Sequence, residues 1–356
     1  MFITIRNKKM QLPIIQGGMG VGISLSRLAG HMAGLGGMGV ISAAHPGYAY
    51  PGFETQPFET NLKAIKEEIK KAKELAAGKG LVGVNIMVAM RRYGEMVKAV
   101  IEGGADAIIS GAGLPLELPK YTEGHDILIA PIVSSARAAK LILRTWDKRY
   151  GRTADFIVIE GHEAGGHLGF KEEDLVADHC QDNETIFNEV KAAIAPFEKK
   201  YAYEIPVFLA GGMYDGKDLA HALQLGAAGV QMATRFICTE ECDAALAYKQ
   251  AFVNAQKEDI VLVKSPVGMM ARAINNPFVQ KLNAGKRIER TRCYQCLIPC
   301  DPKTTPYCIT EALIRAVKGD VEDGLVFCGS NAYRNDGIYP LFQVVNQIMQ
   351  ECEENL

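Results

Sequence analysis

The nine residues 161–169, GHEAGGHLG, place an ionisable side chain directly after a pair of glycines. They follow residues 156–160 (FIVIE), a short apolar run of the kind that forms a buried parallel strand. Four glycines in nine residues let the backbone approach a flat or anionic ligand closely. His167 comes immediately after the glycine pair, and its imidazole can exchange a proton near neutral pH. The segment therefore predicts proton transfer beside a bound ligand, and the alternative is a flexible loop with a solvated histidine.

Two further glycine-rich turns lie downstream. Residues 206–216 (PVFLAGGMYDG) and 226–236 (GAAGVQMATRF) each contain an apolar strand that ends in small residues, with a helical stretch between them. In a βα barrel, a ligand phosphate commonly rests on the loops after the seventh and eighth strands and on a short helix N-terminus. We therefore expect a phosphate site formed by the backbone N–H groups of Gly211, Gly212, Ala233 and Thr234.

Four of the nine cysteines are grouped with the spacing C-x2-C-x3-C-x7-C (Cys293, Cys296, Cys300 and Cys308). In a reducing compartment such a group indicates metal or iron–sulfur ligands rather than disulfides. Basic residues around it would favour thiolates (Arg290, Arg292 and Lys303). The spacing matches no zinc or ferredoxin template, so an iron–sulfur cluster, zinc, a redox-active pair and a chance grouping all stay open.

The elements that would position these residues alternate along the chain. Apolar strand candidates occupy residues 13–16, 38–42, 81–87, 107–110, 127–133, 156–160, 206–210 and 229–232. Helical composition is found at residues 25–33, 61–75, 93–102, 135–149, 184–197 and 217–225. Strands that alternate with helices form a parallel sheet, and eight repeats predict closure into an α/β (β/α)8 TIM barrel.

The chain of 356 residues exceeds a minimal barrel by roughly a hundred residues. The excess lies in a long loop after the sixth strand and in residues 259–310. We expect residues 1–258 to form the barrel and residues 259–310 to form an insertion or lid that carries the cysteine group. Residues 311–356 are expected to be a C-terminal helical segment that packs back on the barrel.

Residues 34–39 (GLGGMG) satisfy the dinucleotide pattern G-x-G-x-x-G. That fingerprint requires a strand, then the glycine turn, then a helix. Here the glycines follow a helical run and precede a strand, which is the opposite order. A tight helix-to-strand turn with glycine at the helix C-terminus explains them better than a Rossmann domain does.

Composition limits the partners and the compartment. A net charge of −2 with mixed signs gives no reason to expect nucleic acid or an anionic membrane as a partner. No apolar run reaches the roughly twenty residues that span a bilayer, and the N-terminus lacks the pattern of a secretory signal. We expect a cytoplasmic protein with a small-molecule substrate, and a homodimer as its assembly.

Taken together, six motifs resemble the nitronate monooxygenase family, formerly called 2-nitropropane dioxygenase, which includes the flavin-type enoyl-ACP reductase. They are IQGGM at 15–19, GVNIM at 83–87, GAG at 111–113, EAGGH at 163–167, AGG at 210–212 and TRF at 234–236. The resemblance covers residues 13–275, with a weaker match at 311–329. It implies an FMN-dependent βα barrel whose flavin phosphate lies on the two downstream glycine turns.

The same resemblance implies roles for individual residues. His167 matches the catalytic histidine, and His162 is a second candidate base. The cofactor-binding positions implied are Gly17, Gly18, Met19, Asn85, Glu160, Gly165, Gly166, Gly211, Gly212, Gln231, Ala233 and Thr234. Ala233 departs from the glycine that many members have before Thr-Arg-Phe. The cysteine group replaces a helical lid of the flavin reductases, so the substrate pocket does not carry over.

Three functions remain from the sequence. The first is an FMN-dependent oxidoreductase of the nitronate monooxygenase type, which oxidises alkyl nitronates with O2. The second is an NAD(P)H-dependent enoyl-thioester (enoyl-ACP) or quinone reductase on the same barrel; Arg91, Arg92 and Lys98 fit a solvated helix face better than a site for a carrier phosphate. The third is a non-redox barrel that uses the same phosphate site.

Overall fold

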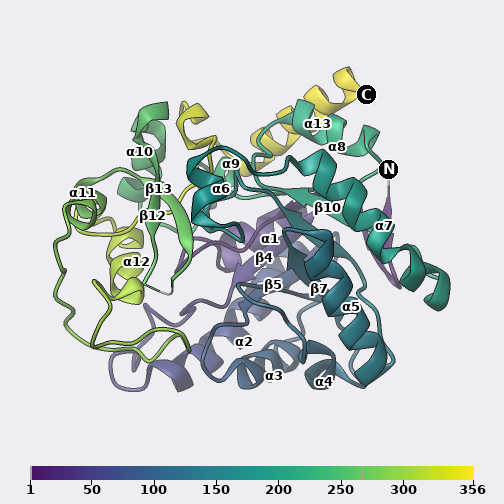
Figure 1. Cartoon of the computed structure of the whole chain (residues 1–356), viewed down its shortest axis with the longest axis horizontal. Helices are drawn as coiled ribbons and strands as arrows, with labels where there is room; N and C mark the ends of the chain where they lie inside the picture. Colours follow the sequence, from purple (N-terminus) through teal and green to yellow (C-terminus); the bar gives the residue numbers. More distant parts are fainter. Residues whose placement is uncertain (1, 267) are drawn as a thin grey trace.

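The computed structural model describes residues 2–266 and 268–356, and its centre is a closed barrel of eight parallel strands (Figure 1). The strands are β3 (Ile14–Gln16), β4 (Met38–Ser42), β5 (Leu81–Met87), β6 (Ala107–Gly111), β7 (Leu128–Val133), β8 (Ile157–Glu160), β10 (Val207–Ala210) and β11 (Gly229–Met232). They pair in chain order, and β11 closes the ring on β3. The predicted (β/α)8 TIM barrel is therefore confirmed.

Helices surround the barrel because each strand is followed by an amphipathic segment. They are α1 (Ser26–Gly34), α2 (Pro57–Ala76), α3 (Tyr93–Glu102), α4 (Leu118–Thr122), α5 (Ala136–Tyr150), α7 (Asn183–Tyr201) and α8 (Gly216–Gln224). Helix α2 begins four residues before the predicted start, because Pro57 fits the first helical turn, where no N–H partner is needed. The glycines at 34–39 link α1 to β4, which confirms a helix-to-strand turn.

The N-terminal end of the barrel is sealed. An antiparallel hairpin, β1 (Ile3–Ile5) with β2 (Lys8–Met10), packs Ile5 and Met10 against residues near the strand starts such as Met38, Phe156 and Phe208. Ligands must therefore enter from the opposite end, where the strands finish in glycine-rich loops.

A lobe stands beside the barrel on the left of Figure 1. It contains α10 (Leu246–Asn254), the short 3-10 helix Lys257–Asp259, the hairpin β12 (Ile260–Lys264) and β13 (Met270–Ile274), α11 (Pro277–Asn283) and α12 (Ile309–Val317). Strand β13 also pairs with β9 (Gly166–His167), which belongs to the loop after β8. The lobe is thus joined to the barrel through the very segment that carries the predicted catalytic histidine.

The remaining elements pack back on the barrel. Short helices α6 (Glu172–Val176) and α9 (Thr234–Ile237) follow β9 and β11, and a 3-10 turn spans Ala332–Arg334. The last helix, α13 (Leu341–Asn355), lies against α8 (Figure 1). The expected domain limits at residues 258 and 310 stay a prediction. In the described ranges, no helix is long and apolar enough to cross a membrane.

Candidate functional site

Two adjoining cavities open where the barrel strands end. The first has a volume of about 160 Å³ and is lined by the glycine turns. The second, of about 910 Å³, lies between the barrel and the lobe. Gly18, Gly165 and Gly166 line both, so the cavities meet at these residues. Every predicted cofactor-binding residue except Asn85 lines the first cavity, and Asn85 lines the second.

The glycines of the first cavity permit close packing that a side chain would prevent. A Cβ on Gly18 would lie 2.5 Å from the Cβ of Asn85. Gly211 and Gly212 both have φ of +83°, a conformation that other residues rarely adopt. Ala233, by contrast, has φ of −130°, so its backbone makes no demand for glycine. Its departure from the family pattern is therefore compatible with the same loop geometry.

A C-terminal segment that the sequence reasoning missed ties these loops together. The N–H of Gly329 donates to Oγ1 of Thr234 (3.0 Å), and the side-chain amide of Asn331 donates to the carbonyl of Gly212 (2.7 Å). The N–H of Ser330 donates to the carbonyl of Glu163 (3.0 Å). The only signal in the sequence is the small polar run CGSN at 328–331, directly after an apolar stretch.

Two buried oxygens in the first cavity lack a hydrogen-bond partner among the described residues. They are Oε1 of Gln231 and Oγ of Ser330. A buried polar group without a partner costs about 1–3 kcal/mol, so such groups normally meet a ligand or water. Because both residues line the cavity, the site fits a ligand that presents polar hydrogens and acceptors to them.

Glu160 adds an ionisable group to the same cavity. It ends β8, and part of its side chain is open to the cavity. The surrounding protein desolvates the carboxylate, and this burial raises its pKa to about 7. Near neutral pH the group can therefore donate as well as accept a hydrogen bond.

His167 lies on the wall of the second cavity, where that cavity meets the first. Its Nε2 is 2.7 Å from Oγ of Ser265 in the lobe, and its ring meets Phe327 edge-on at 5.4 Å between centroids. Burial lowers the pKa of His167 to about 4. The imidazole is therefore neutral at physiological pH, which suits a proton acceptor.

His162 is placed differently, although it comes from the same loop. His162 is not among the described residues that line the two cavities. Its ring packs edge-on against Phe170. The guanidinium of Arg272 donates to the carbonyls of His162 (2.8 Å) and Ala164 (2.6 Å). The structure therefore brings His167 to the cavity and leaves His162 outside it.

A histidine without any surrounding motif does reach the second cavity. His45 lines it, and its Nε2 is 3.0 Å from Oγ1 of Thr310 while its Nδ1 is 3.1 Å from the amide nitrogen of Asn61. Burial lowers the pKa of His45 to about 4. Both ring nitrogens are thus engaged with protein groups.

The wall of the second cavity mixes apolar and basic side chains. Met87, Met90 and Leu297 line it together with three arginines (Arg91, Arg92 and Arg292). Sequence reasoning assigned Arg91 and Arg92 to a solvated helix face; both side chains are exposed, and both also line this cavity. Residue 92 directly precedes α3 and has a positive φ. Arg92 pairs with Glu59 and Glu95, and Arg292 pairs with Glu54.

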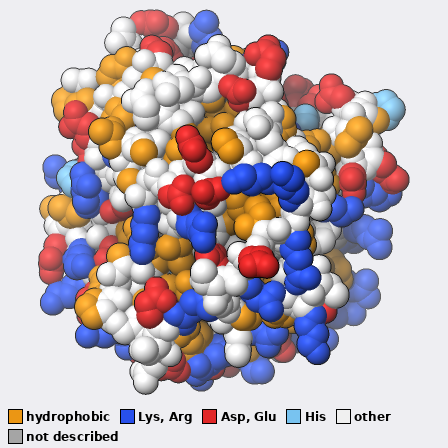
Figure 2. All heavy atoms as spheres, turned by 90° about the vertical axis from the view of Figure 1, so that its left-hand side faces the viewer, with side chains coloured by type: hydrophobic (Ala, Val, Ile, Leu, Met, Phe, Trp, Pro, Cys, Tyr) orange, Lys and Arg blue, Asp and Glu red, His pale blue; other side chains and the backbone are white. Residues whose placement is uncertain are grey.

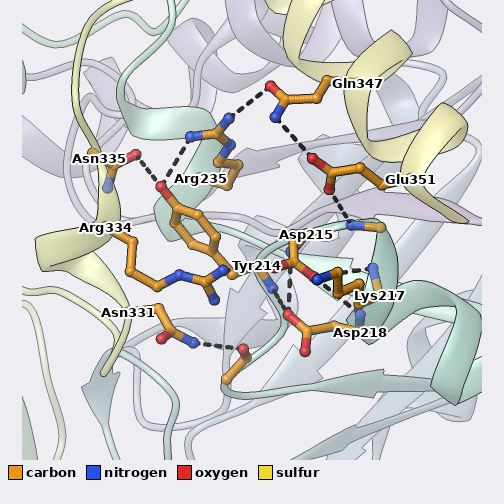
Figure 3. A network of polar contacts seen from close by, with 12 residues as sticks. Tyr214, Asp215, Lys217, Asp218, Arg235, Asn331, Arg334, Asn335, Gln347 and Glu351 are labelled. Atoms are coloured by element: carbon orange, nitrogen blue, oxygen red, sulfur yellow. Dashed lines mark hydrogen bonds and ion pairs between the residues drawn. The ribbon is translucent and has the colours of Figure 1, made fainter. Parts of the chain in front are cut away.

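A polar network connects the glycine turn at 211–212 and the turn at 233–234 to the C-terminal helix (Figure 3). The guanidinium of Arg235 donates to the hydroxyl of Tyr214 (2.9 Å) and to Gln347 of α13 (3.2 Å). The guanidinium of Arg334 donates to Asp215 (2.6 Å) and lies 4.3 Å from the centre of the Tyr214 ring. The network joins the residues after Gly212 and Thr234 to the C-terminal helix, so the two turns hold a fixed relative position.

The four grouped cysteines are free thiols that line a third cavity, of about 290 Å³. Within residues 2–266 and 268–356, no three Cys, His, Asp or Glu side chains converge closely enough to hold a single metal ion.

Comparison with known proteins finds a matching family, related sequences and a similar solved structure. The family model described as nitronate monooxygenase matches residues 3–351. The (3aS,4S,5R,7aS)-5-hydroxy-7a-methyl-1-oxo-octahydro-1H-indene-4-carboxyl-CoA dehydrogenase of Mycobacterium tuberculosis is 28% identical over 275 residues, which are 77% of this chain and 66% of that protein. The chain therefore spans slightly less than two thirds of that relative. A probable nitronate monooxygenase of Staphylococcus saprophyticus is 26% identical over 305 residues, covering 77% and 78% of the two chains. The solved structure of FabK from Thermotoga maritima has a TM-score of 0.72 and 27% identity, covering 97% of this chain and 94% of that one.

Proposed function

Since this chain belongs to the nitronate monooxygenase family, we propose that it is an FMN-dependent oxidoreductase that oxidises alkyl nitronates with O2. The observation that carries the proposal is the place of His167, a neutral imidazole on the wall of the large cavity beside the glycine-lined one. Gly165 and Gly166, the two preceding residues, line both cavities. A substrate in the larger cavity would therefore meet a cofactor in the smaller one next to this imidazole.

The residues of the first cavity fit FMN. The turns at Gly211–Gly212 and at Ala233–Thr234 would hold one phosphate, and the unpartnered Oε1 of Gln231 and Oγ of Ser330 would meet polar groups of the ring and ribityl chain. The described residues form no separate domain for an adenylate half, which favours FMN over FAD. When bound, FMN supplies the electron acceptor for oxidation of the substrate.

His167 is suited to handle the proton of this reaction. A neutral nitroalkane carries a proton on the carbon next to its nitro group, and the neutral imidazole can accept that proton to give the nitronate; a nitronate supplied as the substrate has already lost it. The N–H of His167 can donate a hydrogen bond to a nitronate oxygen. The contact with Ser265 fixes the ring orientation, and the apolar wall of the cavity reduces competition from water.

A second candidate is an NAD(P)H-dependent enoyl-thioester reductase, which the size of the larger cavity favours. A short alkyl nitronate fills little of about 910 Å³, whereas a thioester with its carrier needs a long cavity and basic groups for phosphate. The mycobacterial relative is itself named for a CoA thioester. Against this, Arg92 and Arg292 are already paired with carboxylates, which offsets their charge.

Two measurements test the proposal. Acid release followed by chromatography should recover FMN; recovery of FAD, or of no flavin after reconstitution, would refute the cofactor assignment. Under anaerobic conditions, an alkyl nitronate should bleach the flavin absorbance rapidly. Rapid bleaching by NADH or NADPH, with none by nitronates, would replace the first function with the second.

A further inference from the structure

Residues 284–308, all of which the structure describes, connect α11 to α12 without forming a helix or strand. Connections longer than roughly 12–15 residues without secondary structure are uncommon in compact domains and are usually functional. Apart from bonds at the end of α11 (residues 284–286), in the turn at 301–305 and at the start of α12, three backbone hydrogen bonds are recorded for this segment: Ile288 N–H donates to Pro306 (2.9 Å), Arg91 N–H to Cys296 (3.0 Å), and Ile298 N–H to Ala89 (2.8 Å). The segment nevertheless forms a wall of the large cavity through residues 292–298.

The four grouped cysteines of this segment surround one space. Cys293, Cys296, Cys300 and Cys308 all line the cavity of about 290 Å³, together with Arg91 and Arg290. A void of this size is far larger than the roughly 30 Å³ that one water occupies in the liquid. Cys293 and Cys296 also line the large cavity, so the two spaces share a wall. Four cysteines around one volume of this size leave room for a group larger than a single ion.

The arrangement discriminates between a single ion and a larger group. Structural zinc requires four ligands to meet at one point, with each sulfur about 2.3 Å from the ion. Across the described residues, no such convergence of three or more donors exists. In a four-iron, four-sulfide cluster each cysteine binds a different iron, so the four cysteine sulfurs stand around a volume and share no point. The lining observed here matches the second requirement.

Basic groups line the cavity and would attract an anionic occupant, and the carboxylates of Asp301 and Glu311 also lie near Cys300 and Cys308. A cluster held by four thiolates is negatively charged, and the guanidiniums of Arg91 and Arg290 lie on the same lining. The face of the molecule that carries the lobe shows Lys and Arg side chains mixed with Asp and Glu around a hydrophobic area (Figure 2). We propose that Cys293, Cys296, Cys300 and Cys308 hold an iron–sulfur cluster in this cavity. The cluster ties together a segment with little secondary structure of its own and so shapes the wall of the large cavity.

The test measures the cluster directly. Protein expressed and purified without oxygen should contain about four irons and four acid-labile sulfides per chain. Reduction with dithionite should give an electron paramagnetic resonance signal that flavin does not produce. Cys296→Ser and Cys300→Ser should lose most of the iron and sulfide. Cys180→Ser, a change at a partly exposed thiol outside this cavity, is the matched control and should keep both.

Reconstitution keeps the test independent of how the variants fold. The wild-type protein, stripped of metal and reduced, is incubated with ferrous iron and sulfide, and its FMN content is measured on the same sample. Uptake of both elements supports the proposal. One zinc per chain, an intramolecular disulfide between these cysteines, or no uptake while all four thiols react with a label would each overturn it. FMN content is expected to be unchanged in every case, so a failure here is distinguishable from a failure of the flavin assignment.

Discussion

Replacing His167 with Ala tests the central chemical claim. The backbone of residue 167 pairs with Ala271, and the next N–H donates to the carbonyl of Met270 (2.8 Å), so the strand does not depend on the imidazole. We expect the flavin content to stay near that of the wild type. Turnover of a neutral nitroalkane, which needs a base, should fall about a hundredfold or more, which is the usual contribution of a positioned acid–base group. Turnover of a preformed nitronate, which needs none, should fall less.

The lowered pKa of His167 also predicts how activity depends on pH. The pKa of His167 falls from 6.5 to about 4, which corresponds to about 3 kcal/mol against charging the ring. At pH 7 roughly one imidazole in a thousand is then protonated, compared with about one in four for a solvated histidine. Because a base must be neutral, activity should stay on a plateau down to about pH 5 and be lost as the pH falls through 4. An acid limb near 6.5 would show that burial does not control this group.

The same shift has a consequence for stability. Since the unfolded chain protonates this histidine near pH 6.5 and the folded chain only near 4, stability should fall as the pH drops across that interval. The alanine variant should lack this contribution. His162→Ala is the matched control, because His162 belongs to the same loop but packs on Phe170 outside both cavities. Unchanged turnover in the His167 variant, or a comparable loss in the His162 variant, would refute the reasoning.

Three further changes probe the cofactor cavity. Gly18→Ala would place a Cβ 2.5 Å from the Cβ of Asn85, so most acid-releasable flavin should be lost; Gly83→Ala, whose nearest contact would be 3.4 Å, should retain it. Asn331→Ala removes the 2.7 Å hydrogen bond to the carbonyl of Gly212, which contributes about 1 kcal/mol. The Kd for FMN, measured by fluorescence titration, should therefore rise roughly fivefold. An unchanged Kd would mean that this hydrogen bond does not hold the glycine turn at 211–212 in its FMN-binding conformation. Because burial raises the pKa of Glu160 from 4.5 to about 7, the thermal stability of the flavin-free wild type relative to Glu160→Gln should decrease as pH rises from 4.5 to 7. A difference that does not vary with pH would contradict that assignment.

The barrel could be predicted from the sequence because its signal is local. Each strand is a short, largely buried apolar run, and glycine-rich turns after several of them mark the ligand end. The eight expected strands agree with the observed ones to within one residue at each end. The glycine positions also come together as expected, since consecutive strands of a parallel barrel finish at the same edge.

The rest of the site depends on contacts that have no local signal. Ser265 meets His167 from 98 residues away, and Asn331 meets Gly212 from 119 residues away. Neither serine nor asparagine carries a periodic pattern that would mark it, and each lies outside the barrel repeats. Arg92 lines the large cavity from the position before α3, where it has a positive φ, and composition alone does not indicate either feature.

The lobe orients the loop that carries His167, because strand β13 of the lobe pairs with β9 of that loop. Strand β9 contains just Gly166 and His167, and a strand of two residues has too few hydrogen bonds to hold its own direction. Its position is set by β13, through the pairs Ala271 with His167 and Arg272 with Gly166. The side chain of Arg272 also donates hydrogen bonds to the carbonyls of residues 162 and 164. Ser265 of the lobe contacts the imidazole of His167. The backbone, the loop and the ring of the proposed base are therefore all oriented by residues 265–272. If His167 is replaced by no other base, the proposal therefore predicts that a change in residues 265–272 alters the proposed proton transfer without contact with the substrate.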